Sequence, residues 1–99
     1  MKEQVEKALN SQIQKEGQSS HFYLAMANWA ERQGLNGTSS FMYKQSDEER
    51  FHMLKLVKFV NERGGRALIP SFEKPQEEFE SLMHVFELLL EHEIKVTES

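Results

Sequence analysis

The sequence predicts an all-α fold, a small helical bundle, from the placement of its helix-breaking residues and the spacing of its apolar ones. Both prolines and the pair Gly64-Gly65 fall within residues 64–75, and the remaining glycines are Gly17 and the two in the turn 34–37. Between these breakers, apolar residues recur at intervals of three and four, which is the period of an amphipathic helix. We therefore expect helices at about residues 2–33, 38–64 and 81–98, in one domain that covers residues 1–99.

The first two predicted helices are long and are joined by a short turn. Gly34 is a natural C-terminal residue for the first helix, and Thr38 or Ser39 is a plausible N-cap for the second. Gly17 costs roughly 1 kcal/mol relative to alanine inside a helix, but the residues around it keep the helical period. Two long helices joined by a short turn pack as an antiparallel hairpin.

The segment from Gly65 to about Glu80 contains Pro70 and Pro75 and several glutamates. Proline disrupts helices and central strands, so we expect a long crossing connection with at most a short helical turn. Ser81 then acts as the N-cap of the third helix.

Composition narrows the possible functions. A chain of 99 residues with 38% hydrophobic residues fits one small globular domain. Its net charge of −4 argues against a nucleic-acid partner, which requires clustered lysines and arginines. The absence of cysteine excludes disulfides and thiolate metal sites, so a metal must be held by oxygen and imidazole ligands, which favours iron, manganese or calcium. Without an apolar run of roughly 20 residues or a recognisable signal segment, we expect no membrane partner and a cytoplasmic location.

Each predicted helix carries an acidic residue within its apolar row. A buried carboxylate costs several kcal/mol unless it is neutralised, and carboxylates that converge from three helices repel one another. A multivalent cation removes that conflict because it supplies the opposite charge and accepts several ligands. The three rows are Val5, Leu9, Ile13, Glu16, Ser20, Tyr23, Ala27 and Ala30, then Met42, Gln45, Glu49, His52, Leu56 and Phe59, then Leu82, Val85 or Phe86, Leu89, Glu93 and Val96.

The second row contains the spacing Glu49-x-x-His52. Residues three apart lie on the same face of a helix and within one turn of each other. Both side chains can therefore bind a common ion. A Glu-x-x-His motif with further glutamates from neighbouring helices is the ligand pattern of di-iron carboxylate bundles.

Simpler interpretations of these residues remain open from the pattern alone. Glu49 and His52 can form a solvated helix face, or His52 can pair with Glu48 one turn earlier. Glu16 can lie partly exposed at the edge of its row, and Glu93 belongs to an acidic run at residues 91–93. The case for a metal site rests on the joint occurrence of acids in all three rows.

Other candidate residues have structural interpretations. Tyr23 suits a core tyrosine with a satisfied hydroxyl. The methionines at positions 26, 42, 53 and 83 suit core filling. His21, His84 and His92 fall outside the core rows, so we expect them at the surface.

Three segments resemble the bacterial non-haem ferritins. They are residues 9–23, residues 47–53 (Asp-Glu-Glu-Arg-Phe-His-Met) and residues 91–93 (Glu-His-Glu). Trp29 and the glycine turn before the second helix also fit, and the similarity runs from about Leu9 to the last residue. The resemblance implies a ferritin-like helical bundle.

The resemblance also implies a ferroxidase centre. Glu16, Glu49 and His52 would hold a first iron, with Glu49 bridging to a second iron that Glu93 binds. Glu48 would be a ligand of an accessory iron site, and Tyr23 would be a catalytic residue beside the di-iron centre. Members of the family oxidise Fe²⁺ with oxygen or peroxide and store the ferric mineral in a 24-subunit shell.

The sequence departs from the family pattern because it ends within the third helix. A family subunit has a fourth helix, which contributes Gln and Glu ligands, followed by a short C-terminal helix. The chain can be a shortened subunit, which we favour, a piece of a longer protein, or half of a pair of chains that complement each other. In the last case two copies of Glu16, Glu49 and His52 would form a symmetric di-iron site.

We expect a homo-oligomer because the third helix is strongly apolar and needs a partner. Its apolar residues are Leu82, Phe86, Leu88, Leu89, Leu90 and Ile94.

Two other classes of function remain as alternatives. One is another di-iron bundle, such as bacterioferritin, which would show haem absorbance, or a rubrerythrin-type protein, which usually needs cysteine. The other is a metal-free helical oligomerisation module.

Overall fold

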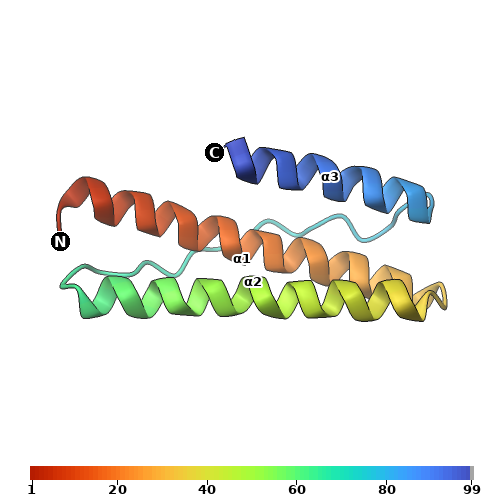
Figure 1. Ribbon diagram of the computed structural model, residues 1–99, viewed down its shortest axis with the longest axis horizontal. Coiled ribbons are helices and arrows are strands. Elements are labelled where there is room, and N and C mark those ends of the chain that lie inside the picture. The colour runs from red at the N-terminus through yellow and green to blue at the C-terminus, as the bar shows by residue number, and fades with distance from the viewer. Residues whose placement is uncertain (99) are drawn as a thin grey trace.

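The computed structural model describes residues 1–98 and contains three helices. They are α1 (Glu3–Arg32), α2 (Asn36–Glu62) and α3 (Leu82–Glu98). α1 and α2 form an antiparallel hairpin, and α3 lies beside α1 and runs antiparallel to it (Figure 1). No strand occurs in residues 1–98, which confirms the predicted all-α fold class.

Glycines end both helices of the hairpin. Gly34 adopts φ 76°, and the Leu35 amide donates to the Ala30 carbonyl at 2.9 Å. Gly64 adopts φ 83°, and the Gly65 amide donates to the Val60 carbonyl at 3.0 Å. Only glycine takes positive φ at little cost, so these two residues fix where the long helices end.

The N-cap residues were predicted correctly for α3 but not for α2. α2 begins at Asn36 with Leu35 at the N-cap position and no side-chain cap, so the prediction of Thr38 or Ser39 as N-cap was wrong. The main-chain turn after Gly34 starts the helix before either hydroxyl is reached. At α3 the prediction is confirmed, because the His84 amide donates to Ser81 Oγ at 3.1 Å.

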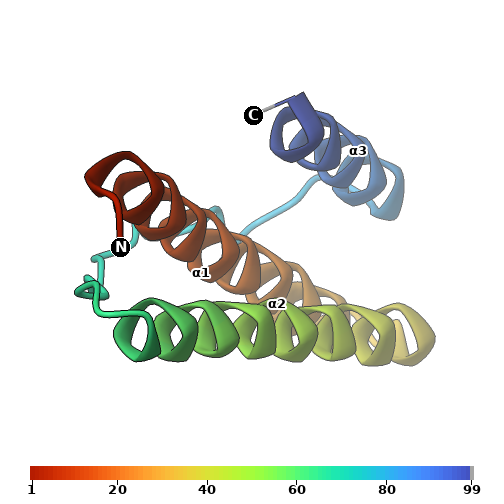
Figure 2. The same ribbon diagram turned by 60° about the vertical axis from the view of Figure 1, so that its left-hand side comes forward.

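The connection between α2 and α3 is extended and returns along the hairpin (Figure 2). Residues 65–79 contain no helix, as expected from Pro70 and Pro75. The connection brings the start of α3 back to the turn end of α1, where Phe79 packs edge-on against Trp29 with ring centroids 5.7 Å apart.

The main core lies at this end of the molecule, where α1, α2, the connection and the start of α3 meet. Burying one large apolar side chain stabilises a fold by about 1.5–3 kcal/mol, so this cluster accounts for the docking of α3. Its buried members are Tyr23, Met26, Ala27, Trp29, Ala30, Met42, Phe79 and Val85.

The buried row of α2 is shifted by about one position from the predicted one. Its buried members are Ser39, Met42, Ser46 and Val60, whereas the predicted Phe59 is 40% exposed and the His52 side chain 54% exposed. The shift arises because Ser46 faces Ser20 across the helix pair, where small side chains let the backbones approach. The predicted rows contained Ser20 on α1 but had Gln45 in place of Ser46 on α2, and they missed Ser39.

The far half of α3 is only partly covered. α3 lies against α1 and not against α2 in the part of the chain that the structure describes. Phe86 is 45%, Leu90 63% and Ile94 48% exposed. Met83 is 72% exposed, which contradicts its predicted role as core filler, because it lies on the side of α3 away from α1.

None of the helices within residues 1–98 combines the length and the apolar character needed to cross a lipid bilayer.

Gly17 has a packing role in the interior of α1. A Cβ atom built at this position would overlap the Phe72 ring and lie 2.8 Å from Met53 Sδ. The connection therefore crosses α1 closely at this point, and the missing side chain makes room for Phe72.

We expect Gly17→Ala to lower the free energy of unfolding by about 1 kcal/mol, because overpacking costs about 1–3 kcal/mol and improved helix propensity returns about 1 kcal/mol. Gly37→Ala is the matched control, since a Cβ there meets nothing within 4 Å, and it should stabilise by about 0.4–1 kcal/mol. Urea unfolding measures both. A gain in stability for Gly17→Ala equal to that of Gly37→Ala would contradict the close crossing.

Candidate metal centre

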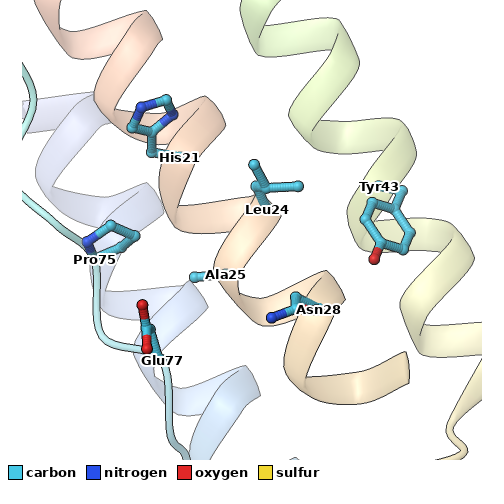
Figure 3. Close-up of a pocket in the computed structure, with 7 residues that line it drawn as sticks. All are labelled: His21, Leu24, Ala25, Asn28, Tyr43, Pro75 and Glu77. Carbon is cyan, nitrogen blue, oxygen red and sulfur yellow. The ribbon is translucent and has the colours of Figure 1, made fainter. Parts of the chain in front are cut away.

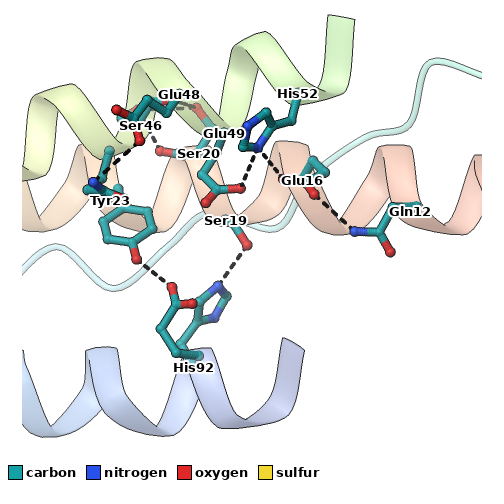
Figure 4. A network of polar contacts seen from close by, with 12 residues as sticks. Gln12, Glu16, Ser19, Ser20, Tyr23, Ser46, Glu48, Glu49, His52 and His92 are labelled. Carbon is teal, nitrogen blue, oxygen red and sulfur yellow. Dashed lines mark hydrogen bonds and ion pairs between the residues drawn. The ribbon is translucent and has the colours of Figure 1, made fainter. Parts of the chain in front are cut away.

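Glu16, Glu49 and His52 come together between α1 and α2 (Figure 4). One potential ligand atom from each lies within 4.8 Å of the other two. His52 Nδ1 is 3.6 Å from Glu16 Oε2 and 3.8 Å from Glu49 Oε2. Two ligands on one ion, each at about 2 Å, lie no more than about 4 Å apart, so small side-chain rotations bring all three atoms onto one cation.

A pair of serines one turn away sets the spacing of the two helices. Ser20 Oγ donates to the Ser46 carbonyl and Ser46 Oγ donates to the Ser20 carbonyl, each at 2.8 Å. These reciprocal bonds hold α1 and α2 close and fix their register, so Glu16 comes opposite Glu49. On α1, Gln12 Nε2 donates to Glu16 Oε1 at 3.0 Å and orients that carboxylate.

The pKa values of Glu49 and Glu16 are shifted in opposite directions. Burial, together with the neighbouring Glu16 carboxylate and the charges of Glu93 and Glu48, raises the pKa of Glu49 to about 8. Burial also raises the pKa of Glu16, but hydrogen bonds with Glu49 and Gln12 and the charge of His52 outweigh it, so the net shift is downward. At neutral pH Glu49 therefore retains a proton, which a bound cation would displace.

Glu93 reaches the edge of this centre from α3. The Tyr23 hydroxyl donates a hydrogen bond to Glu93 Oε1, and burial together with that bond raises the pKa of Tyr23 above its usual value. Glu93 is not part of the three-residue cluster. Its charge nevertheless contributes to the raised pKa of Glu49.

Glu48 lies on the exposed side of α2. It accepts a hydrogen bond from Gln45 Nε2 at 3.5 Å and is not part of the cluster. The structure thus brings together three of the five predicted ligands, holds Glu93 beside them through Tyr23, and leaves Glu48 on the surface. The role of each residue as a metal ligand stays a prediction.

The prediction that His92 is a surface residue was wrong. Its ring is half-buried, with Nε2 2.8 Å from Ser19 Oγ and its centroid 4.6 Å from that of Phe22. Burial lowers the pKa of His92 below its usual value, which favours the neutral form of the ring. His92 lies next to the core row of α3 and faces α1, a placement that the row alone does not reveal.

The other two histidines predicted at the surface, His21 and His84, are also partly buried. The His21 ring meets Phe72 edge-on at 4.8 Å, and His84 Nδ1 accepts a hydrogen bond from the Glu80 amide at 3.2 Å. Both are therefore packed against the connection rather than free at the surface.

A separate groove of about 380 Å³ lies between α1, α2 and the connection (Figure 3). Its residues from α1 are His21, Leu24, Ala25 and Asn28, and none of the cluster residues Glu16, Glu49 and His52 lines it. The groove is mainly apolar, and Glu77 is its one carboxylate. It is distinct from the candidate metal centre.

Glu49→Gln should alter the pH dependence of stability in the metal-free protein. The pKa of Glu49 is about 8 when folded and near its model value of 4.5 when unfolded. The folded state therefore binds the extra proton, and stability is lost as pH rises from about 4.5 to about 8. Glutamine removes this loss, so the variant should gain stability relative to wild type between pH 5 and pH 8.

Urea unfolding in the presence of a chelator, at pH 5 and at pH 8, measures the difference in stability between wild type and Glu49→Gln. Glu48→Gln, an exposed neighbour, is the control and should follow the wild-type curve. If wild type and Glu49→Gln change in parallel with pH, Glu49 is not held in the crowded environment described.

Comparison with known proteins identifies the family of the chain. Residues 6–99 match the family of ferritin-like domains. The chain is 41% identical over 97 residues to a probable bacterial non-heme ferritin-like protein of Haemophilus influenzae, covering 98% of this chain and 59% of that protein. It is 34% identical over 99 residues to a bacterial non-heme ferritin of Campylobacter jejuni, covering all of this chain and 59% of that protein.

Solved structures agree in fold and sequence. An open-pore ferritin from the archaeon Archaeoglobus fulgidus superposes with a TM-score of 0.92 at 41% identity, over 99% of this chain and 60% of that one. A humanized archaeal ferritin gives 0.93 at 42% identity, with the same coverage. The chain thus spans about three-fifths of the length of these relatives. The resemblance to the bacterial non-haem ferritins is confirmed, and this chain belongs to the ferritin family.

Proposed function

We propose that this chain binds Fe²⁺ between α1 and α2 and oxidises it to Fe³⁺ for storage, as one ferritin-like domain of a cytoplasmic iron-storage assembly. The observation that carries the proposal is the cluster of Glu16, Glu49 and His52, whose potential ligand atoms all lie within 4.8 Å of one another. Two carboxylates and an imidazole suit iron better than calcium, which prefers oxygen ligands alone. The curated relatives named bacterial non-heme ferritin support the choice of iron.

The first Fe²⁺ would take Glu16, Glu49 and His52 as ligands. Glu49 would give up its proton on binding, and the charge of the ion would then compensate the two adjacent carboxylates. The Gln12 hydrogen bond to Glu16 Oε1 leaves Oε2 of that carboxylate facing His52. This arrangement supports the assignment of Glu16 and His52 as ligands of the same ion.

The second Fe²⁺ would lie between Glu49, acting as a bridge, and Glu93. The hydrogen bond from Tyr23 holds Glu93 beside the centre, and iron would compete with this bond. Two Fe²⁺ ions held close together can each give one electron to the same oxygen or peroxide molecule, and carboxylates favour the ferric product. Glu48, one position before Glu49, is available on the surface for an accessory iron.

Association of several copies is part of the proposal. α3 exposes Phe86, Leu90 and Ile94 along its length, and α2 exposes Phe51 (55%) and Leu54 (43%). Monomeric soluble proteins rarely expose large apolar patches, so these faces favour a homo-oligomer. The 24-subunit shell and the pairing of two chains across a two-fold axis are the two arrangements to distinguish.

One observation favours a metal-free structural module as the second candidate. His52 Nδ1 lies 3.6 Å from Glu16 Oε2 and 3.8 Å from Glu49 Oε2, so the three side chains contact one another without a cation. In that case removing His52 should weaken the packing of α1 against α2 and change no ligand binding. Among related di-iron proteins, a bacterioferritin would add haem absorbance, and a rubrerythrin-type site would need the cysteines that this sequence lacks.

Aerobic Fe²⁺ oxidation, followed by ferric-carboxylate absorbance with native mass recorded on the same sample, tests the proposal. We expect an oligomer that binds about two irons per site and oxidises them. Glu49→Ala should abolish oxidation and keep the helical content, because it removes the bridging ligand. Glu62→Ala, an exposed glutamate at the end of α2, is the matched control and should oxidise iron like wild type.

A monomeric wild-type chain that binds no iron would reject both the iron function and the association. Equal iron binding by wild type and Glu49→Ala would favour the structural module.

A further inference from the structure

α3 is attached to the rest of the molecule in two different ways along its length. Its first half is held by the apolar core, where Val85 is fully buried. Farther along, Leu90 and Ile94 are largely exposed. Among the side chains that the structure describes there, the polar links to α1 are Ser19–His92 and Tyr23–Glu93.

The Ser19–His92 link is a packed contact. Ser19 is 4% exposed, its Oγ lies 2.8 Å from His92 Nε2, and the imidazole packs against the Phe22 ring with centroids 4.6 Å apart and ring planes tilted by 40°. A ring held by a hydrogen bond and by a packed aromatic neighbour has a defined orientation. His92 thus fixes the side of α3 that faces α1 at this level.

The Tyr23–Glu93 link has less support of its own. Glu93 is an exposed residue on α3, and its described hydrogen-bond partner is the Tyr23 hydroxyl. Ser19 and Tyr23 are one turn apart on α1, and His92 and Glu93 are neighbours on α3, so the two links lie side by side. Figure 4 shows Ser19, Tyr23 and His92 at this point. A rotation of α3 that breaks the Ser19 bond would also carry Glu93 away from Tyr23.

We propose that His92, bonded to Ser19 and packed on Phe22, is a positioning residue that sets the rotation of α3 and holds Glu93 toward the metal centre. The role of Glu93 as an iron ligand rests on the proposed function, whereas the effect of His92 on the Tyr23–Glu93 contact does not. Groups that orient metal ligands through hydrogen bonds typically change metal affinity by about 10- to 100-fold when removed.

The first test uses the metal-free full chain and the hydroxyl proton of Tyr23. The sequence has two tyrosines, so Tyr43→Phe leaves a single tyrosine hydroxyl. Tyr23 is buried and donates this proton to the Glu93 carboxylate, so the proton should give a downfield NMR resonance. We expect His92→Leu and Ser19→Ala to abolish or shift this resonance, and His92→Gln to keep it, because the glutamine amide can replace Nε2.

His84→Leu is the matched control on the same helix. His84 is also a partly buried histidine with one hydrogen bond, to the Glu80 amide, and it does not contact Ser19. Circular dichroism shows whether each variant keeps its helices. An unchanged Tyr23 resonance in His92→Leu would overturn the proposal, as would equal loss of the resonance in His84→Leu.

Anaerobic Co²⁺ titration then separates this inference from the proposed function. The wild-type chain should bind a first and a second ion, and His92→Leu should weaken the second by about 10- to 100-fold while sparing the first. His92→Gln should restore it. Equal weakening of both ions would overturn the positioning role. If the wild-type chain binds no Co²⁺, the proposed function fails, and the Tyr23 resonance still decides what His92 does.

Discussion

The unfavourable proximity of two carboxylates, Glu16 and Glu49, is the constraint on which the rest of the site depends. The serine pair Ser20 and Ser46 draws α1 and α2 together, and the glutamates one turn away are then forced into the same half-buried space. The two carboxylates would repel each other if both were ionised, and a proton on Glu49 or a bound cation removes this repulsion. A domain with a total stability of about 5–15 kcal/mol tolerates such a conflict only when other packing compensates.

That compensation comes from the ends of the molecule. The core around Met26, Trp29 and Phe79 holds the hairpin, the connection and the start of α3 together. At the opposite end of the hairpin, Asn10 binds the connection through the Arg66 carbonyl and the Leu68 amide. The polar centre lies between these two regions, so its side chains can be arranged for ligand binding without being required to hold the helices together. The contacts of α3 near the centre are the weakest part of this arrangement.

The sequence predicted the helices well because their ends depend on local chemistry. Gly34, Gly64 and Ser81 mark helix ends by properties of single residues, and the prolines keep the connection extended. The buried residues of α2 and α3 were predicted less well. The burial of Ser46 instead of Gln45 depends on a contact with Ser20 on another helix, and the burial of His92 depends on Ser19 and Phe22. Neither follows from the period of one helix. The acids that interrupt the rows were found because a charged residue among apolar ones stands out in any register.

The most direct test of the central claim is to locate the metal. Crystals of the chain soaked anaerobically with Fe²⁺ and measured at the iron absorption edge should show an anomalous peak bounded by Glu16, Glu49 and His52. Its height should fall to background in crystals of His52→Ala. A peak elsewhere on the surface, with these three side chains unchanged and paired with one another, would contradict the account.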